Sequence, residues 1–108
     1  MLTWREISLE TRGEAEFKVG RVLATSTALR ILEISDIINA FSRYLTLDFG
    51  EIPLHVFDMN FEELHDNDGE IVAEYQSLAG IKFHLVTQID RCRTLLFLST
   101  DNISISTL

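Results

Sequence analysis

The stretch VTQIDRCRTLLFLS, residues 86–99, consists of two apolar runs separated by a short charged segment. The run from residue 81 to 90 alternates between two sets of side chains. One set is Ile81, Phe83, Leu85, Thr87 and Ile89, and the other is Lys82, His84, Val86, Gln88 and Asp90. Such alternation is typical of a strand with one face in the core and one face in water. Because the chain must reverse at residues 90–93, and Asp favours turns, the stretch predicts an antiparallel hairpin with solvated charges at its tip.

The chain before this hairpin supplies one strand and three helices. Residues 17–24 alternate as a short strand, and residues 25–34 and 35–49 carry apolar residues at helical spacing. Thr25 or Ser26 is expected to cap the first of these helices, and Gly50 to end the second in a left-handed conformation. A third, short helix is expected at residues 60–65, with Asn60 as its cap and Glu63 completing a capping box.

The second half of the chain reads mainly as β-structure. Residues 70–78, 81–89 and 94–99 are expected to be strands, and residues 102–108 alternate as a further edge strand or a frayed end. The order β-α-α-α-β-β-β predicts an α+β fold, with an antiparallel three- to four-stranded sheet and helices packed on one face. Residues 1–16 are interpreted as a polar N-terminal lead-in anchored by Trp4 and Ile7, and residues 17–108 as a single domain.

The balance of charge limits the possible partners. Seventeen Asp and Glu against nine Lys and Arg give a formal net charge of -8. A chain this acidic is poorly suited to binding nucleic acid, where Lys and Arg neutralise phosphates. It is suited to docking on a basic protein surface that normally holds nucleic acid, although charge that only keeps a protein soluble explains the same composition.

Cysteine usage and hydropathy indicate the compartment. The single cysteine cannot form an internal disulfide, and no apolar run approaches the length of a membrane span. The N-terminus also lacks the layout of a secretion signal. We therefore expect a soluble cytosolic protein, with no direct nucleic-acid or membrane contact.

The densest run of carboxylates lies between residues 62 and 70. It comprises Glu62, Glu63, Asp66, Asp68 and Glu70. One interpretation is a partner-binding acidic face that mimics phosphates spaced along a nucleic-acid strand. The other is a solvated helix and loop with no partner. General acid–base catalysis is disfavoured, because it requires a carboxyl whose surroundings shift its pKa.

The candidates for catalysis or metal binding are few. Cys92 lies between Arg91 and Arg93, whose charge favours a thiolate, but no histidine close in sequence can act as its base. The three histidines, His55, His65 and His84, lack the spacing of a metal site. There is also no phosphate-cradling glycine loop and no serine elbow. The sequence therefore predicts no enzyme, no cofactor and no metal.

Several short motifs follow one another from about residue 17 to residue 99. They are Ala24-Thr25 with Ala28-Leu29, Arg43-Tyr44 with Asp48-Phe49-Gly50, Tyr75, and Thr87 with Asp90-Arg91 and Thr94. In this order they resemble a family of short proteins of bacterial plasmids and other mobile elements. Its members are labelled plasmid-related or hypothetical, and some as a type I restriction–modification subunit. They read A-T-x-x-A-L, then R-H-x-x-G-D-W-G, then a tyrosine closing a strand, then T-E-x-D-R-S-x-T-T.

The chain departs from the family pattern at several positions. Tyr44 replaces the histidine, Leu47 the first glycine, Gln88 the glutamate, Cys92 the serine and Leu95 the second threonine. Losing the histidine and the glutamate removes the best acid–base candidates of the pattern. The matching residues are Arg43, Asp48, Gly50, Tyr75, Asp90, Arg91 and Thr94. The resemblance implies that they form an ion-pair and turn-holding network rather than a catalytic site.

Charge and resemblance together predict a small acidic, non-enzymatic binding protein of a phage or mobile element. It would inhibit a host defence complex, as anti-CRISPR or anti-restriction proteins do, by covering a basic nucleic-acid-binding surface. An alternative is a plasmid-borne regulatory module that forms a homodimer through an edge strand such as residues 102–108. A third hypothesis is a residual enzyme that uses Asp90, Arg91 and Cys92.

Overall fold

The computed structural model describes residues 2–8, 17–66, 69–101 and 103, which form an α+β fold, as expected. The strands are β1 (Trp4–Ile7), β2 (Arg21–Thr25), β3 (Glu70–Gln76), β4 (Lys82–Gln88) and β5 (Arg93–Leu98). The helices are α1 (Ser26–Ile31), α2 (Ile34–Leu45) and α3 (Leu54–Asp66), with short 3-10 turns at Ile89–Arg91 and Ser99–Asp101. Within these described ranges, none of the helices is long and apolar enough to cross a membrane.

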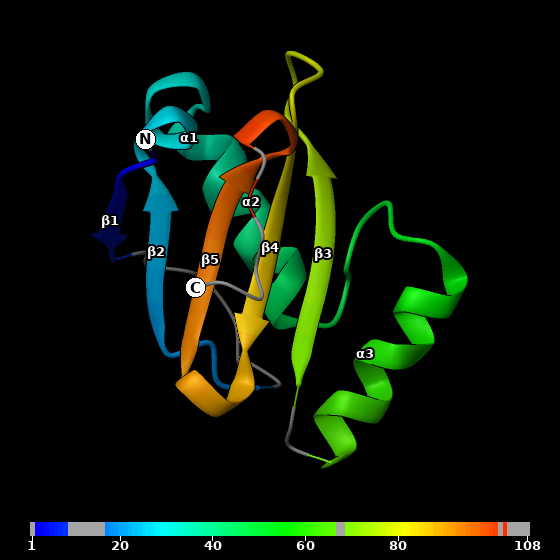
Figure 1. The fold of residues 1–108 in the computed structure, drawn as a ribbon. Coiled ribbons are helices and arrows are strands. Elements are labelled where there is room, and N and C mark those ends of the chain that lie inside the picture. Colours follow the sequence, from blue (N-terminus) through cyan, green and yellow to red (C-terminus); the bar gives the residue numbers. More distant parts are fainter. Residues whose placement is uncertain (1, 9–16, 67–68, 102, 104–108) are drawn as a thin grey trace.

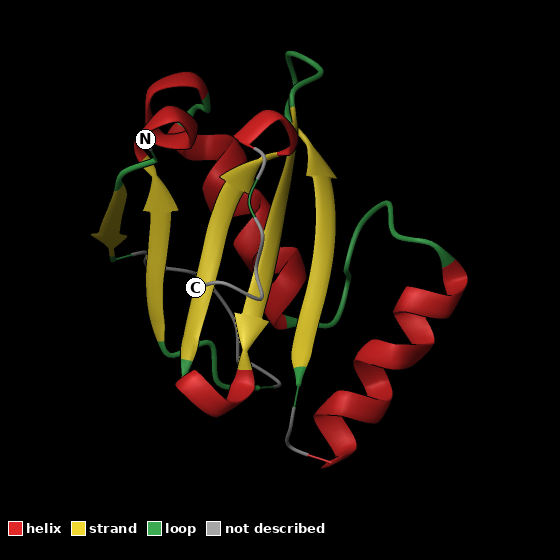
Figure 2. Cartoon of the chain, viewed as in Figure 1, coloured by secondary structure: helices red, strands yellow, loops and turns green. Residues whose placement is uncertain are grey.

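The strands form one mixed sheet in the order β1-β2-β5-β4-β3 (Figures 1 and 2). The pairs β1–β2, β5–β4 and β4–β3 are antiparallel, but β2 and β5 run parallel. This differs in two respects from the expected antiparallel sheet of three to four strands. β1 adds a strand within residues 1–16, the segment interpreted as a lead-in. The chain also passes through all three helices before β5 returns beside β2, which is the long crossover that parallel strands need.

β5 lies in the middle of the sheet and is buried on both faces. Its consecutive apolar residues Leu95, Leu96, Phe97 and Leu98 are all buried. A continuous apolar run suits a strand that is covered on both sides, whereas an alternating run suits a strand with one wet face. The unbroken hydrophobicity of this strand is therefore explained by its central position.

α2 lies across one face of the sheet and forms the core with it (Figure 1). Ile37, Phe41 and Tyr44 of α2 are almost fully buried and share a cluster with Phe83 and Leu85 of β4. A smaller cluster lies on the opposite face and contains Val86, Leu95 and Phe97, with Trp4, Leu23 and Val72 packed against it. The expectation of helices on one face holds for α2, whereas α3 lies alongside β3 at the end of the sheet (Figure 1).

The N-terminal cap of α1 is one of the two residues expected. The residue that ends α2 differs from the expected one. Thr25 Oγ1 accepts a hydrogen bond from the Ala28 N–H at 3.1 Å, which caps α1. α2 ends at Leu45, and Leu47 rather than Gly50 takes the left-handed conformation there, with a φ of 71°. The Asp48 N–H donates to the Arg43 carbonyl at 2.9 Å, which satisfies one of the last carbonyls of the helix.

Gly50 has a different role, because it brings the chain against the outer edge of β3. Its φ is 73°, and a Cβ atom at this position would lie 2.0 Å from the Glu74 carbonyl oxygen. The Glu51 N–H donates to that carbonyl at 2.8 Å, and the Glu74 N–H donates to the Phe49 carbonyl at 3.1 Å. Since only glycine tolerates this approach, Gly50 fixes the connection between α2 and α3 to the sheet.

α3 is longer than the helix expected at residues 60–65, and Asn60 does not cap it. The helix begins at Leu54, after Pro53, which suits a helix start because no N–H bond is needed there. Asn60 lies in mid-helix and is 1% exposed. Its Nδ2 donates to the Val72 carbonyl at 2.8 Å, and its Oδ1 accepts from the Val72 N–H at 3.0 Å. Asn60 therefore satisfies the outer edge of β3, a role that sequence alone does not distinguish from a cap.

The hairpin between β4 and β5 is confirmed. The chain turns through the 3-10 turn Ile89–Arg91, and Cys92 follows in the left-handed conformation with a φ of 49°. The Cys92 carbonyl accepts the Arg21 N–H at 3.0 Å, so the turn is tied to the start of β2. The edge strand expected at residues 102–108 lies outside the described residues except for Ile103, and it stays a prediction.

Candidate functional site

The negative charge of the chain is concentrated in one segment. Residues 44–81 contain nine Asp and Glu and no Lys or Arg, whereas the rest of the chain contains eight Asp and Glu and nine Lys and Arg. The segment includes all of α3 and β3, which lie side by side at one end of the sheet (Figure 1). The formal net charge of -8 therefore comes from this end of the molecule.

The outward side of α3 carries a row of carboxylates. Asp58, Glu62 and Asp66 are all exposed and follow one another at four-residue intervals. Side chains four residues apart lie on the same face of a helix, and the rise of the helix separates them by about 6 Å along its axis. We call these three residues the α3 acidic ridge. Asp58 was not part of the predicted acidic face, although its spacing from Glu62 was a signal for it.

The residues of the predicted acidic face do not all lie alike. Glu62 and Asp66 belong to the α3 acidic ridge, and Glu70 is exposed at the start of β3. Glu63 is half-buried beside Gly69, where a Cβ atom would meet its Oε2. Asp68 lies outside the described residues.

No basic side chain in the described part of the protein neutralises the α3 acidic ridge. The ion pairs among the described residues join Arg21 to Glu6 and Arg43 to Asp48, and His84 Nε2 lies 3.8 Å from Glu74 Oε1. None of them involves α3. Because like charges at four-residue spacing repel each other, the row costs helix stability rather than adding to it.

Large apolar side chains flank the α3 acidic ridge. Leu54 is 74% exposed and Met59 is 53% exposed, and Phe57 and Phe61 are also partly open to solvent. Phe57 and Phe61 contact Phe49 edge-on, each with ring centroids 6.1 Å apart, so each ring is half-anchored to the body of the protein. Exposed apolar surface rimmed by charge is typical of a protein–protein interface.

Four of the residues that match the family motifs meet between α2 and β3. The Arg43 guanidinium donates from Nε to Asp48 Oδ2 at 2.8 Å and from Nη2 to Asp48 Oδ1 at 3.2 Å. The Gly50 N–H donates to Asp48 Oδ1 at 3.2 Å, and the Tyr75 hydroxyl donates to the Asp48 carbonyl at 2.7 Å. The hydrogen bond from Arg43 holds the pKa of Asp48 below its ordinary value, although partial burial opposes this. The group joins the end of α2 to the sheet.

The remaining matching residues lie elsewhere. Thr94 Oγ1 lies 2.7 Å from Thr87 Oγ1, which lies 2.7 Å from the Tyr44 hydroxyl in the core. Burial raises the pKa of Tyr44, so it stays a neutral phenol. Asp90 is exposed on the turn between β4 and β5, and the side chain of Arg91 lies outside what the structure describes.

Two residues between α2 and α3 take the left-handed conformation. Leu47 has a φ of 71° and Gly50 a φ of 73°. Glycine adopts this conformation without steric cost, whereas leucine does so only with strain.

A cavity of about 810 Å³ lies between α3, the chain before β2 and the turn after β4. Its walls combine apolar and polar side chains. The lining residues are Phe17, Lys18, Leu47, Phe61, Leu64, His65, Ile89, Asp90 and Cys92. We call this space the α3 cavity. Sequence reasoning did not find it, because its walls come from segments far apart in the chain and no spacing rule connects them.

The α3 cavity brings a histidine to the same space as the cysteine, but it does not form a nucleophilic site. Catalysis by Cys92 requires a base within hydrogen-bond reach of its thiol. No hydrogen bond joins Cys92 Sγ to His65 or to another base among the described residues. In the same part of the chain, no three His, Cys, Asp or Glu side chains are placed to hold a metal ion.

The contacts of His84 include a serine and a carboxylate, the partners that histidine has in a serine triad. Its Nε2 lies 2.9 Å from Ser99 Oγ and 3.8 Å from Glu74 Oε1, and its ring stacks on Phe97. In a serine triad the serine and the carboxylate bind opposite nitrogens of the imidazole. Here both partners approach the same nitrogen, so the carboxylate does not orient the ring for proton transfer.

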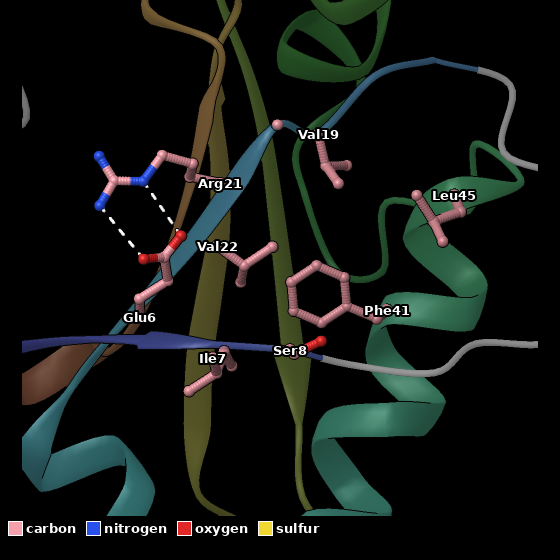
Figure 3. A pocket seen from close by; sticks show the side chains of 9 residues that line it. Glu6, Ile7, Ser8, Val19, Arg21, Val22, Phe41 and Leu45 are labelled. Carbon is pink, nitrogen blue, oxygen red and sulfur yellow. Dashed lines mark hydrogen bonds and ion pairs between the residues drawn. The ribbon is translucent and has the colours of Figure 1, made fainter.

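A second cavity, of about 550 Å³, lies between β1, β2 and α2. Ile7, Val22 and Phe41 line it. Glu6 and Arg21 also line it, and their side chains pair with each other (Figure 3). The Arg21 guanidinium donates to Glu6 at 3.0 and 3.3 Å, and this pair lowers the pKa of Glu6. The ion pair connects β1 to β2. Because it is exposed, it contributes little to stability.

No known protein family, curated protein or solved structure matches the chain.

Proposed function

We propose that this chain is a small, non-enzymatic binding protein that uses the outward side of α3 to cover a basic, nucleic-acid-binding surface of another protein. The observation that carries the proposal is the separation of charge: nine carboxylates and no Lys or Arg in residues 44–81. A surface with one sign of charge attracts partners of the opposite sign and repels nucleic acid itself.

The α3 acidic ridge suits this task physically. A groove that binds nucleic acid presents Lys and Arg to a regular row of phosphates. Asp58, Glu62 and Asp66 offer such side chains a row of negative charges on a helix, and no described basic side chain pairs with them. The exposed Leu54 and Met59 add apolar contacts, which supply affinity that does not depend on salt.

The family-motif residues support a binding protein rather than an enzyme. Arg43, Asp48 and Tyr75 bond to one another, and their polar groups are used to connect α2 with β3. Thr94 is buried in the core. Residues engaged in this way hold the scaffold in shape.

The choice of a host defence complex as the partner rests on the resemblance to proteins of mobile elements. Complexes that cleave invading DNA carry the basic grooves that the α3 acidic ridge would fit. In this proposal the chain acts as an anti-CRISPR or anti-restriction inhibitor of a phage or mobile element, and it competes with the nucleic acid for the groove.

A plaque assay on hosts with defined CRISPR or restriction systems tests the proposal. Expression of the chain should restore plaques on at least one defended host, and the protein should co-purify with the defence complex in a salt-sensitive manner. The double variant Asp58→Asn/Glu62→Gln should lose both effects. The matched variant Glu33→Gln/Glu51→Gln removes the same charge from exposed sites off α3 and should keep them. If both double variants restore plaques to the same extent on the defended host, the α3 acidic ridge is not the interface.

A further inference from the structure

The α3 cavity and the α3 acidic ridge belong to the same helix. Phe61, Leu64 and His65 line the cavity, while Glu62 and Asp66 are exposed between and beside them. A partner side chain that enters the cavity would therefore bring its own backbone close to these carboxylates. The two features form one continuous surface of mixed character.

We propose that the α3 cavity receives an aromatic or large aliphatic side chain of the basic partner, flanked in the partner's sequence by Lys or Arg. The inference rests on the proposed function and specifies the kind of segment that the partner must present. The flanking cations contact Asp90 and the α3 acidic ridge, which includes Asp66.

The size and lining of the cavity support an apolar occupant. Its volume of about 810 Å³ lies within the range of about 300–1,000 Å³ that is typical of binding pockets. Phe17, Leu47, Leu64 and Ile89 are each half-buried at its walls, so they retain apolar surface that an entering side chain can cover. Removing that surface from water stabilises the complex in proportion to the area covered.

The charges around the cavity favour cations beside that occupant. Asp90 lies at the rim, and Asp66 ends α3, where the carbonyl end of the helix also carries partial negative charge. Among the described lining residues only Lys18 has a fixed positive charge. It comes from the chain before β2, so the cations are expected on the α3 side of the cavity. Aromatic side chains and Arg are also the residues that dominate the energy of protein interfaces.

Two synthetic peptides test the inference. Both are acetylated and amidated; one reads Lys-Arg-Trp-Arg-Lys and the other has serine in place of tryptophan. We expect the tryptophan peptide to bind at least about tenfold more tightly by calorimetry, since it alone places a large apolar side chain in the cavity. In NMR titrations the amides of Leu64 and Ile89 should shift with the tryptophan peptide and not with the serine peptide.

The thiol at the cavity rim supplies a control that leaves the fold unchanged. Alkylation of the exposed Cys92 with pyrene maleimide places a bulky apolar group at the rim of the cavity. It should reduce the affinity of the tryptophan peptide to that of the serine peptide and leave the serine peptide unaffected. Unmodified protein, treated with the same reagent after the reagent has been quenched with free thiol, should keep the full preference for tryptophan.

The outcomes separate this inference from the proposed function. Equal, salt-sensitive binding of both peptides overturns the cavity as a binding site and leaves the acidic interface standing. A preference for tryptophan that survives alkylation of Cys92 also overturns it. If neither peptide binds, the inference fails, and the plaque assay decides on the proposed function by itself.

Discussion

α2 and α3 are nearly equal in length, with 12 and 13 residues, but they relate to the sheet in opposite ways. α2 buries Ile37, Ala40, Phe41, Tyr44 and Leu45. Of the residues in α3, all of which the structure describes, only Asn60 is buried. α2 is held by a buried apolar face. α3 is held by the two hydrogen bonds of Asn60 to the edge of β3 and by partly exposed rings that contact Phe49.

The difference between the two helices separates residues that the fold requires from residues that it does not. The apolar face of α2 is what a helix needs in order to cover a sheet. Packing does not account for the row of carboxylates on α3 or for the exposed Leu54 and Met59. A partner protein would give these side chains a use, and for this reason we propose a binding role for α3.

The largest expected effect of a substitution lies on α2. Phe41→Ala should reduce the free energy of unfolding by about 3–5 kcal/mol, because it leaves a cavity between α2 and the sheet. Urea denaturation followed by circular dichroism measures this. The matched truncation on α3, Met59→Ala, removes an exposed side chain and should change the same quantity by less than about 0.5 kcal/mol. Similar losses for the two variants would end the distinction between the helices.

Asn60 should matter more than any exposed residue of α3. Asn60→Ala leaves the N–H and carbonyl of Val72 without their partner at the outer edge of β3, which should cost about 2–3 kcal/mol. Asn39→Ala, an exposed substitution of the same type on α2, is the control and should stay within about 0.5 kcal/mol of the wild type. Hydrogen exchange gives a local readout: the Val72 amide should lose protection in the first variant. An unchanged Val72 amide would show that Asn60 does not hold α3 in place.

Asp48 follows α2 and provides a carboxylate whose role is structural. Because Arg43 lowers its folded-state pKa below the unfolded value near 3.8, it stabilises the fold above that pH. This contribution is lost as the pH falls through the lower folded-state pKa. Both side chains are about half exposed, so it should be less than about 1 kcal/mol. The difference in stability between wild type and Asp48→Asn should therefore shrink on acidification below about pH 4. A difference that grows instead would contradict the assigned ion pair.

The smallest effect on stability is expected on the α3 acidic ridge. Asp58→Asn/Glu62→Gln should change the free energy of unfolding by no more than about 0.5 kcal/mol, and in the stabilising direction if repulsion dominates. Thermal denaturation at low salt is the measurement. A loss well above 1 kcal/mol would mean that these carboxylates support the fold, and the contrast with Asp48 would disappear.

The local features of the fold were largely predictable from the sequence. The alternation of residues 81–90 identifies β4 because each residue of a strand faces the opposite side from its neighbours. The cap of α1 was predictable to within Thr25 or Ser26, and residues 90–93 were predictable as a turn, because these roles depend on neighbours in sequence. Interactions between residues close in sequence can be inferred from the order of those residues.

The features that the sequence did not disclose depend on residues far apart. β1 has only four residues and too little pattern to be recognised. The parallel pairing of β2 with β5 is decided by how the helices cross the sheet. Asn60 has the signature of a cap but finds its partner in Val72 of β3. The α3 cavity likewise joins Phe17, Leu64 and Cys92, which no spacing rule connects.

The position of β5 has a consequence for how the protein assembles. β5 is the last of the described strands in sequence, yet it lies between β2 and β4 and connects the two halves of the sheet. Synthesis proceeds from the N-terminus, so β1 and β2 emerge early and wait for a neighbour that is made only after the rest of the sheet. Pairings between such distant segments are slow to form. A nascent chain released before β5 would leave the edges of β2 and β4 unpaired and open to association with other chains.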